Sequence, residues 1–445
     1  MQRLLRCFRS PADSHTGSGS GSSHPRLREL TRALRKARAY KEPEWKLGAR
    51  RFLLVAFLIG LGGWSLSARS PILAAPQPPT AGHSSPRQHD TNGTPPDRRV
   101  LSKDARLAFI RQAQVWKPTD IPQMDLRAGP AGPGAFQPNE HVTCTYAEVP
   151  RHGATRKFHC TLPSGEVVKV RYGTHNGEVQ ASVVSTRLLW ALGFQADRVY
   201  PVRVTCRGCS SDPWIHRGGR HETHDFDPAV IERKPPGHVM RDTNDKPSGW
   251  SWSELDLVDA SIGGAPAEQR DALKLLAAFI QHTDSKRQQQ RLVCASGDSD
   301  NGGCTEPFLM VHDVGMTFGR ANTFNGDATG SVNFEAWSRT PIWKNPAACV
   351  AELSKSHTGT LGDPRIAEVG RQFLANLLEQ LSDRQIRDLF EIAGVERRAD
   401  SSGRMSGVPV DEWVAAFKSK RDEIVRNHCG TSSTHVGPAL DLIVH

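Results

Sequence analysis

The sequence predicts a mixed α+β fold in two lobes, and two observations lead to that prediction. Short extended runs separated by Gly- and Pro-containing turns dominate about 100 residues that begin near residue 140. Helical patterns dominate the following stretch of about 190 residues, from Asp256 onward. Strands followed by helices are typical of an α+β fold. We therefore expect a strand-rich lobe at about 140–235 and a helical lobe at about 250–430.

The first 100 residues carry most of the charge and no core pattern. Residues 1–51 hold thirteen Lys or Arg against four Asp or Glu, which accounts for +9 of the formal net charge of +10. Segment 52–68 has no charged residue and is 17 residues long, near the lower limit for a membrane-spanning helix. Residues 69–100 are rich in Pro, Ser and Thr, which predicts a linker. The near-neutral remainder disfavours nucleic-acid binding.

The flanks of the apolar segment indicate its orientation. Basic residues precede it and few charges follow, so the positive-inside rule places a partly disordered tail, 1–51, in the cytoplasm. The domain, 101–445, is then periplasmic or otherwise extracytoplasmic, held to the membrane by one N-terminal helix. A cleaved signal peptide is an alternative that exports the same body, although its basic region is long for one. A buried core helix is the other alternative.

The cysteines agree with export. Cys7 precedes the apolar segment and eight cysteines follow it, an even number that predicts disulfides in an oxidising compartment. Local spacing favours three pairs, and a long-range pair remains, although sequence alone leaves other pairings open. The expected disulfides are Cys144–Cys160, Cys206–Cys209, Cys294–Cys304 and Cys349–Cys429.

Each element of the strand-rich part has a local signature. Ser102 is a predicted N-cap for a helix whose apolar face includes Phe109, Ala113 and Trp116. Alternating or β-branched runs bounded by turn residues predict the strands, and the apolar run after residue 176 predicts a helix. The expected strands are 141–149, 156–163, 166–173, 197–206 and 228–234, with a helix at 177–194.

The helical part has a longer apolar period. Leu273, Leu276 and Ile280 recur on one face, which predicts a core helix. Ser382 and Gln385 have the spacing of a capping box. The expected helices are 265–282, 363–381, 383–393 and 409–426, with extended runs at 291–294 and 307–311.

A cluster of polar residues follows the first of these helices. Asp284 lies in a loop just before a strand, with His282 two residues before it, Lys286 two after and Gln289 five after. The order His282-Thr283-Asp284, with Gln289 beyond, is similar to the protein-kinase catalytic loop His-Arg-Asp-x-x-x-x-Asn. Asp313, which ends a short apolar strand two residues before a glycine, resembles the metal-binding Asp of Asp-Phe-Gly.

The upstream residues extend this resemblance. Lys169 lies in the middle of a strand and Glu178 begins the following helix, as do the paired strand Lys and helix Glu of the kinase small lobe. The chain thus resembles the protein-kinase-like superfamily over about residues 140–395. It looks closer to the atypical branch, the HipA-like and secretory-pathway kinases, in an exported, bacterial-type membrane-anchored protein.

The resemblance implies a two-lobed kinase-like fold that binds ATP and Mg²⁺. Lys169 would hold the α- and β-phosphates, and Glu178 would hold Lys169 in place. Asp313 would bind the metal, because hard oxygen ligands suit Mg²⁺. Asp284, in the loop of His282, would orient the acceptor hydroxyl, with Lys286 close to the transferred phosphate.

Two departures from the kinase pattern leave activity open. Gln289 stands where the kinases have a metal-binding Asn, and its longer amide would ligate less tightly. The loop at 150–155 has Gly153 alone in place of a glycine-rich motif. Segment 230–237 falls where a kinase has its hinge, so the backbone near Glu232 is expected to meet adenine. The chain is therefore either a phosphotransferase or an inactive pseudokinase that serves as a binding scaffold.

The sequence does not identify the substrates. An acceptor protein, a glycan and a lipid headgroup all fit an exported kinase-like domain. ATP is scarce outside the cytoplasm, which favours another donor, an inactive scaffold or the opposite topology.

Two other polar clusters compete with this interpretation. Cys206, Cys209, His221 and His224 form a C-x2-C-x11-H-x2-H array that approximates a Zn²⁺ site, although its His spacing is one residue short. Export favours a disulfide there instead. The acidic loop 297–303 resembles part of a calcium loop but lacks its closing Glu, so a hairpin tip is the favoured interpretation.

Overall fold

The structure is a computed structural model that describes residues 100–430 except 151, 217–221, 235–236, 243, 245, 296–303, 320–331, 354, 357 and 401–402. All described residues lie in the second of the two units into which internal contacts divide the chain, Arg87–His445, and that unit is described by itself. The predicted tail (1–51), the membrane segment (52–68) and nearly all of the linker (69–100) lie outside the described residues. Within the described ranges, no helix combines the length and the apolar character that crossing a membrane requires.

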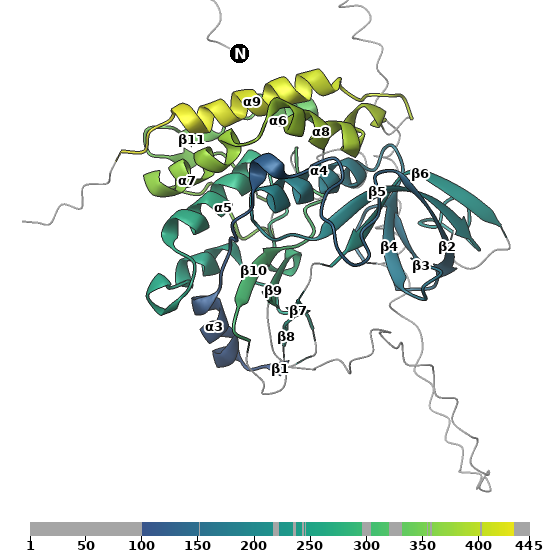
Figure 1. The fold of residues 1–445 in the computed structure, drawn as a ribbon, viewed down its shortest axis with the longest axis horizontal. Coiled ribbons are helices and arrows are strands. Elements are labelled where there is room, and N and C mark those ends of the chain that lie inside the picture. The colour runs from purple at the N-terminus through teal and green to yellow at the C-terminus, as the bar shows by residue number, and fades with distance from the viewer. Residues whose placement is uncertain are drawn as a thin grey trace, which may run out of the picture. The chain divides into compact units, whose positions relative to one another are not determined.

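The strand-rich lobe is a closed barrel in the order β2-β3-β4-β6-β5 (Figure 1). Its strands are β2 (Glu140–Ala147), β3 (Lys157–Thr161), β4 (Val167–Tyr172), β5 (Arg198–Arg207) and β6 (Thr223–Arg233). Parallel pairing of β2 with β5 closes the barrel, and the other neighbours are antiparallel. Alternate side chains such as Phe158, Val170 and Ile231 fill its interior. The predicted strands are confirmed, except that β6 begins before the expected 228–234.

Helix α4 (Gly177–Ala191) joins the barrel to the helical lobe. It packs against β5 on one side and α8 on the other. Val183 and Leu188 belong to the larger of the hydrophobic cores, not to the barrel interior. Nearly the whole helix is buried, which explains why its sequence is apolar on several faces. Asn176 caps it by accepting a hydrogen bond from the backbone N–H of Glu178.

The helical lobe groups several helices away from the barrel strands (Figure 1). Its helices are α3 (Lys103–Gln112), α5 (Ala267–Phe279), α6 (Phe334–Arg339), α7 (Glu368–Glu379), α8 (Asp383–Ala393) and α9 (Val410–Arg426). The capping box of Ser382 and Gln385 is confirmed at the start of α8. The mixed α+β fold, with a strand-rich part and a helical part, is therefore the observed one.

Outside the barrel, the short strands that the structure describes form three small sheets, β1-β8, β10-β9-β7 and β11-β12. They are β1 (Val100–Leu101), β7 (His238–Val239), β8 (Arg241–Asp242), β9 (Gln290–Cys294), β10 (Pro307–Val311), β11 (Trp343–Asn345) and β12 (Val350–Ala351). The order β10-β9-β7 forms the central sheet of this group. The antiparallel β9–β10 hairpin ends with Gln290 opposite Val311, which sets the residues that follow β10 beside those that precede β9.

The end of helix α3 corrects one prediction. Ser102 caps the helix as expected, but the helix ends at Gln112, so Trp116 is not on its face. The backbone of Gln114 pairs with β10 instead, accepting from Leu309 and donating to Pro307. The unpaired edge of β10 thus draws this segment out of the helical conformation.

All four expected disulfides are present. Cys144–Cys160, Cys206–Cys209, Cys294–Cys304 and Cys349–Cys429 are bonded. The Cys206–Cys209 bond overturns the zinc interpretation, because it consumes both thiols that would have been ligands. Of the two histidines in that array, His224 contacts Glu222 at 2.9 Å and His221 lies outside the described residues. The loop 297–303 also lies outside them.

Candidate functional site

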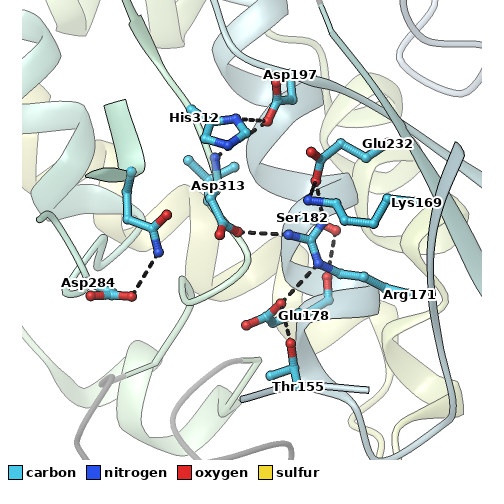
Figure 2. A network of polar contacts seen from close by, with 12 residues as sticks. Thr155, Lys169, Arg171, Glu178, Ser182, Asp197, Glu232, Asp284, His312 and Asp313 are labelled. Carbon is cyan, nitrogen blue, oxygen red and sulfur yellow. Dashed lines mark hydrogen bonds and ion pairs between the residues drawn. The ribbon is translucent and has the colours of Figure 1, made fainter. Parts of the chain in front are cut away.

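A buried guanidinium, that of Arg171 on β4, organises the contact between the barrel and the residues after β10. Its side chain is 2% exposed and contacts three carboxylates. The distances are 3.0 Å to Glu178, 2.6 Å to Glu232 and 2.8 Å to Asp313. Figure 2 shows Arg171 between these groups, which come from α4, β6 and the end of β10 (Figure 2). Because a guanidinium has five N–H donors in a fixed plane, one side chain can hold all three.

Lys169 precedes Arg171 by two residues and lies on the same face of β4. Its ammonium is 2.6 Å from Glu232, not paired with Glu178 as the sequence predicted. The predicted Lys169–Glu178 pair is therefore wrong, because Arg171 reaches the helix while Lys169 faces the neighbouring strand β6. In the ladder, Lys169 stands directly opposite Glu232, which explains their contact.

The position of Glu232 also differs from the prediction that its backbone forms a hinge that meets adenine. It lies within β6, opposite Lys169 on one side and Val199 on the other, so its backbone belongs to the barrel rather than to a free hinge. Its buried carboxylate contributes to the site instead. Burial alone would raise the pKa of Glu232, but Lys169 and then Arg171 lower it well below its usual value. The carboxylate is therefore ionised at neutral pH.

Glu178 anchors the first turn of α4 to the loop before β3. Its Oε2 accepts a hydrogen bond from the hydroxyl of Thr155 at 2.8 Å and another from Arg171. The side chain is 10% exposed. Thr155 lies in the segment that carries Gly153, so α4, β4 and the Gly153 loop are fixed to one another through a single carboxylate.

Asp313 follows β10 and turns back toward the barrel. Its φ of 49° lies in the left-handed region, which aspartate tolerates better than most residues. Burial raises the pKa of its carboxyl, but Arg171, Lys169 and His312 together lower it far below the usual value. Arg171 takes Oδ1, and Oδ2 makes no hydrogen bond or ion pair with any residue that the structure describes.

Asp284 lies in the loop after α5, where three side chains contact its carboxylate. Lys286 and Gln289 donate to Oδ2 at 2.9 Å and 3.1 Å, and Ser356 donates to Oδ1 at 3.3 Å. The backbone N–H of Ser356 also donates to Thr283 at 2.8 Å, so the loop is held from both sides. A carboxylate fixed in this way is oriented rather than free to rotate.

A continuous series of contacts joins Asp284 to the barrel cations. Gln289 bonds Asp284 with its side chain and accepts with its carbonyl oxygen from the N–H of His312, at 3.0 Å. Asp313 is the next residue and contacts Arg171. The five residues that the sequence placed at one site, which span more than a hundred positions, are thus brought together. Those residues are Lys169, Glu178, Asp284, Gln289 and Asp313.

His282 lies in the core behind the loop, a position that does not fit its predicted catalytic role. It is 1% exposed and packs on Trp252, with ring centroids 5.8 Å apart. Within the described chain, neither ring nitrogen has a hydrogen-bond partner. Burial lowers the pKa of His282 to about 4, although Asp284 and Asp313 oppose the shift. The side chain is therefore a neutral core residue behind the loop.

A second acidic group lies beside Asp313. One ligand atom each of Asp197, Glu232 and His312 falls within 4.8 Å of the others, an arrangement that can hold a metal ion. Asp197 and His312 contact each other directly. Lys169 and Lys234 already neutralise the carboxylates of this group, Lys234 standing 3.2 Å from Glu232 and 3.7 Å from Asp197. The carboxylates of this group therefore already have cationic partners.

Sequence reasoning missed Arg171, Thr155 and Ser356. For Arg171 a signal existed, since it shares a strand face with Lys169 by the period of two. The other two come from loops, and no sequence pattern points to them.

The comparisons with known proteins add little to this geometry. No family model and no curated protein matches the chain. Among solved structures, it is similar to the Helicobacter pylori proinflammatory kinase CtkA at 10% identity and a TM-score of 0.35, over 65% of this chain and 95% of that chain. A likeness this distant does not indicate a function for this chain.

Proposed function

We propose that this chain is a kinase-like phosphotransferase that moves a phosphoryl group from a nucleotide to an acceptor hydroxyl. The supporting observation is the series of contacts that sets an oriented carboxylate, Asp284, near a carboxylate suited to a metal, Asp313, beside barrel cations. Phosphoryl transfer needs those three things and little else from a protein. Asp284 would orient the acceptor hydroxyl, with Lys286 beside the transferred group.

The residues fit a Mg²⁺ ion together with the phosphates of ATP. Asp313 keeps one carboxylate oxygen without a partner among the described residues, and Gln289 uses its amide N–H₂ on Asp284, which leaves its amide oxygen. Both are hard oxygen ligands of the kind that Mg²⁺ prefers. When bound, the ion would neutralise charge on the phosphates. The chain's own residues would hold the ion and orient the acceptor.

Calorimetric titration of the full-length protein with ATP, with and without Mg²⁺, tests the proposal. We expect Mg²⁺-dependent binding that Asp313→Ala removes. Asp284→Ala should keep that binding and lose transfer of radiolabelled phosphate, because Asp284 acts on the acceptor. Lys418→Ala, which removes only a surface ion pair with Asp383, is the control and should change neither. A folded protein that binds no nucleotide would refute the proposal.

A second candidate function rests on the same ion pairs. Arg171 occupies one oxygen of Asp313 at 2.8 Å, and Gln replaces the expected Asn at position 289. Both features weaken metal binding, which favours a pseudokinase that binds nucleotide or a partner without transfer. ATP binding without turnover on protein, glycan or lipid acceptors would support this candidate over the first.

We also propose that the domain from residue 101 is extracytoplasmic and anchored through 52–68, with the tail 1–51 in the cytoplasm. The four disulfides support an oxidising compartment, because such bonds are rare in the cytosol. An alkaline phosphatase fusion after residue 445 should be active in cells. An inactive fusion, with a cytoplasmic reporter active at the same point, would contradict this topology.

A further inference from the structure

Two pairs of basic residues face each other on the outer side of the β3–β4 ladder. Lys157 stands directly opposite Arg171, and His159 stands opposite Lys169. The side chains that alternate with them, such as Phe158, point into the barrel core. Like charges placed directly across a ladder destabilise it. Each pair therefore needs a compensating feature.

Three of these four residues have such a feature. Arg171 is paired with three carboxylates, and Lys169 with Glu232. His159 avoids the repulsion by staying neutral, because burial, Lys169 and Lys157 lower its pKa. Lys157 differs from all of them. Its ammonium forms no ion pair with any carboxylate in the described part of the chain.

The surroundings of Lys157 place its ammonium at the candidate site. A Cβ atom added to Gly153 would lie 2.8 Å from Lys157 Nζ, so the ammonium lies directly against this loop. On another side, Nζ is 5.9 Å from the centroid of the Trp214 ring. Glu178 and Asp313 are close enough to act on it electrostatically, without contacting it. The ammonium thus lies between the Gly153 loop and the carboxylates of the site.

The chain keeps this lysine against its own stability. Burial is the largest cause that lowers the pKa of Lys157, and Arg171 and Lys169 lower it further, while Glu178 and Asp313 oppose them. A half-buried cation without a carboxylate partner is unfavourable in the free protein, and the Trp214 ring at 5.9 Å offsets only part of that cost. A charge that destabilises the free protein in this way is common at sites that bind a charged ligand.

We infer that Lys157 is the phosphate-binding cation of this site and that it contacts the terminal phosphates of a nucleotide beneath the Gly153 loop. The inference rests on the proposed function, and it assigns to Lys157 the phosphate contact that the sequence predicted for Lys169. Lys169 and Arg171 are already held by carboxylates and hold the site together, whereas Lys157 is free to meet an anion. Gly153 has a φ of 88° and no side chain, which allows the loop to approach both the ammonium and a phosphate.

The test compares full-length wild type with Lys157→Met by calorimetric titration with AMP, ADP, ATP and inorganic triphosphate in Mg²⁺. We expect the Kd for ATP and for triphosphate to rise about tenfold or more in the variant, as for loss of a charge-assisted hydrogen bond. The Kd for AMP should change less than about twofold. Lys157→Arg should retain part of the affinity for ATP. Lys117→Met, at an exposed lysine outside the site, should behave as wild type.

Unfolding of the ligand-free proteins separates a binding role from a structural one. Lys157→Met should be about as stable as wild type, because the cation that it removes has no ion pair and only a distant contact with the Trp214 ring, but ATP should raise its melting temperature less. A variant that is clearly less stable without ligand would overturn the inference.

The remaining outcomes distinguish this inference from the proposed function. Equal ATP affinity in wild type and Lys157→Met would overturn the inference and leave the proposed function standing. If folded wild type binds no nucleotide, the proposed function fails. Triphosphate binding that Lys157→Met abolishes would then still support an anion site at this lysine, and absence of triphosphate binding would overturn both.

Discussion

Replacing Arg171 with methionine should destabilise the protein more than most single changes. Methionine has a similar length and no charge, so the variant removes the ion pairs while filling much of the space. It leaves three carboxyl groups close together without their shared guanidinium, those of Glu178, Glu232 and Asp313. Glu232 keeps Lys169 as a partner at 2.6 Å, and Glu178 keeps a hydrogen bond from Thr155, which limits the loss.

The expected loss in the free energy of unfolding is about 3–5 kcal/mol at pH 7, as for removal of one partner from a buried ion pair. The three contacts do not add, because Asp313 is 28% exposed and water can solvate it. Glu178, at 10% exposure, carries most of the loss. A double variant, Arg171→Met with Glu178→Gln, should therefore recover a large part of it.

Urea-induced unfolding of wild type, both variants and Arg171→Lys, followed by tryptophan fluorescence, measures these values. Lysine keeps the charge but not the planar set of donors, so its stability should lie between wild type and methionine. The pKa values of Glu232 and Asp313 lie below their usual range in the folded protein. Their stabilising contribution is thus complete above the unfolded-state pKa of about 4 and is lost at more acid pH.

The difference in the free energy of unfolding between wild type and Arg171→Met should accordingly be largest near neutral pH and smaller at acid pH. A loss below about 1 kcal/mol at pH 7 would refute the argument, because it would put the pair in the range of exposed ion pairs. A loss that does not depend on pH would also contradict it, since packing alone would then explain the change.

Two further predictions concern the helical lobe. The Cys349–Cys429 bond closes a loop with a sequence separation of 80. The chain-entropy model therefore predicts that the double variant with serine at both positions loses about 4 kcal/mol in the free energy of unfolding. A loss under about 1 kcal/mol in urea titration would contradict this prediction. The pKa of buried His282 is about 4, below its unfolded value of 6.5, so the unfolded state binds more protons between these values. The free energy of unfolding of wild type should therefore fall by about 3 kcal/mol from this group as pH falls from 6.5 to 4. His282→Phe should lack this loss when unfolding is measured across the same pH range. Identical pH profiles for the two proteins would contradict the prediction.

Local patterns in the sequence were sufficient for most elements, and they favoured the disulfide pairs that the structure contains. Alternation predicted the barrel strands, and the apolar period predicted α5 and the helices from α7 to α9. Ser102 and Ser382 cap helices where their side chains suggested it. These features depend on neighbours close in sequence, which is why they can be read without a fold. The prediction failed at Trp116, where a distant strand edge determines the backbone.

In the site, too, some features follow from the sequence and others depend on contacts between distant segments. The sequence supplied Lys169, Glu178, Asp284 and Asp313 as a set, because a resemblance in order and spacing connected them. The order alone did not show that Arg171, rather than Lys169, contacts the helix. That choice depends on which side of β4 faces β6 and which end of the strand lies over α4.

The sequence by itself thus determined the class of fold and the order of its elements, and it favoured the disulfide pairs, because these features follow from periodicity and spacing along the chain. Only the tertiary structure decided the ion pairs of Arg171, the burial of His282 and the lack of an ion pair at Lys157 within the described chain. A charge has its effect through space over a few ångströms, and sequence distance does not encode which opposite charge will lie there.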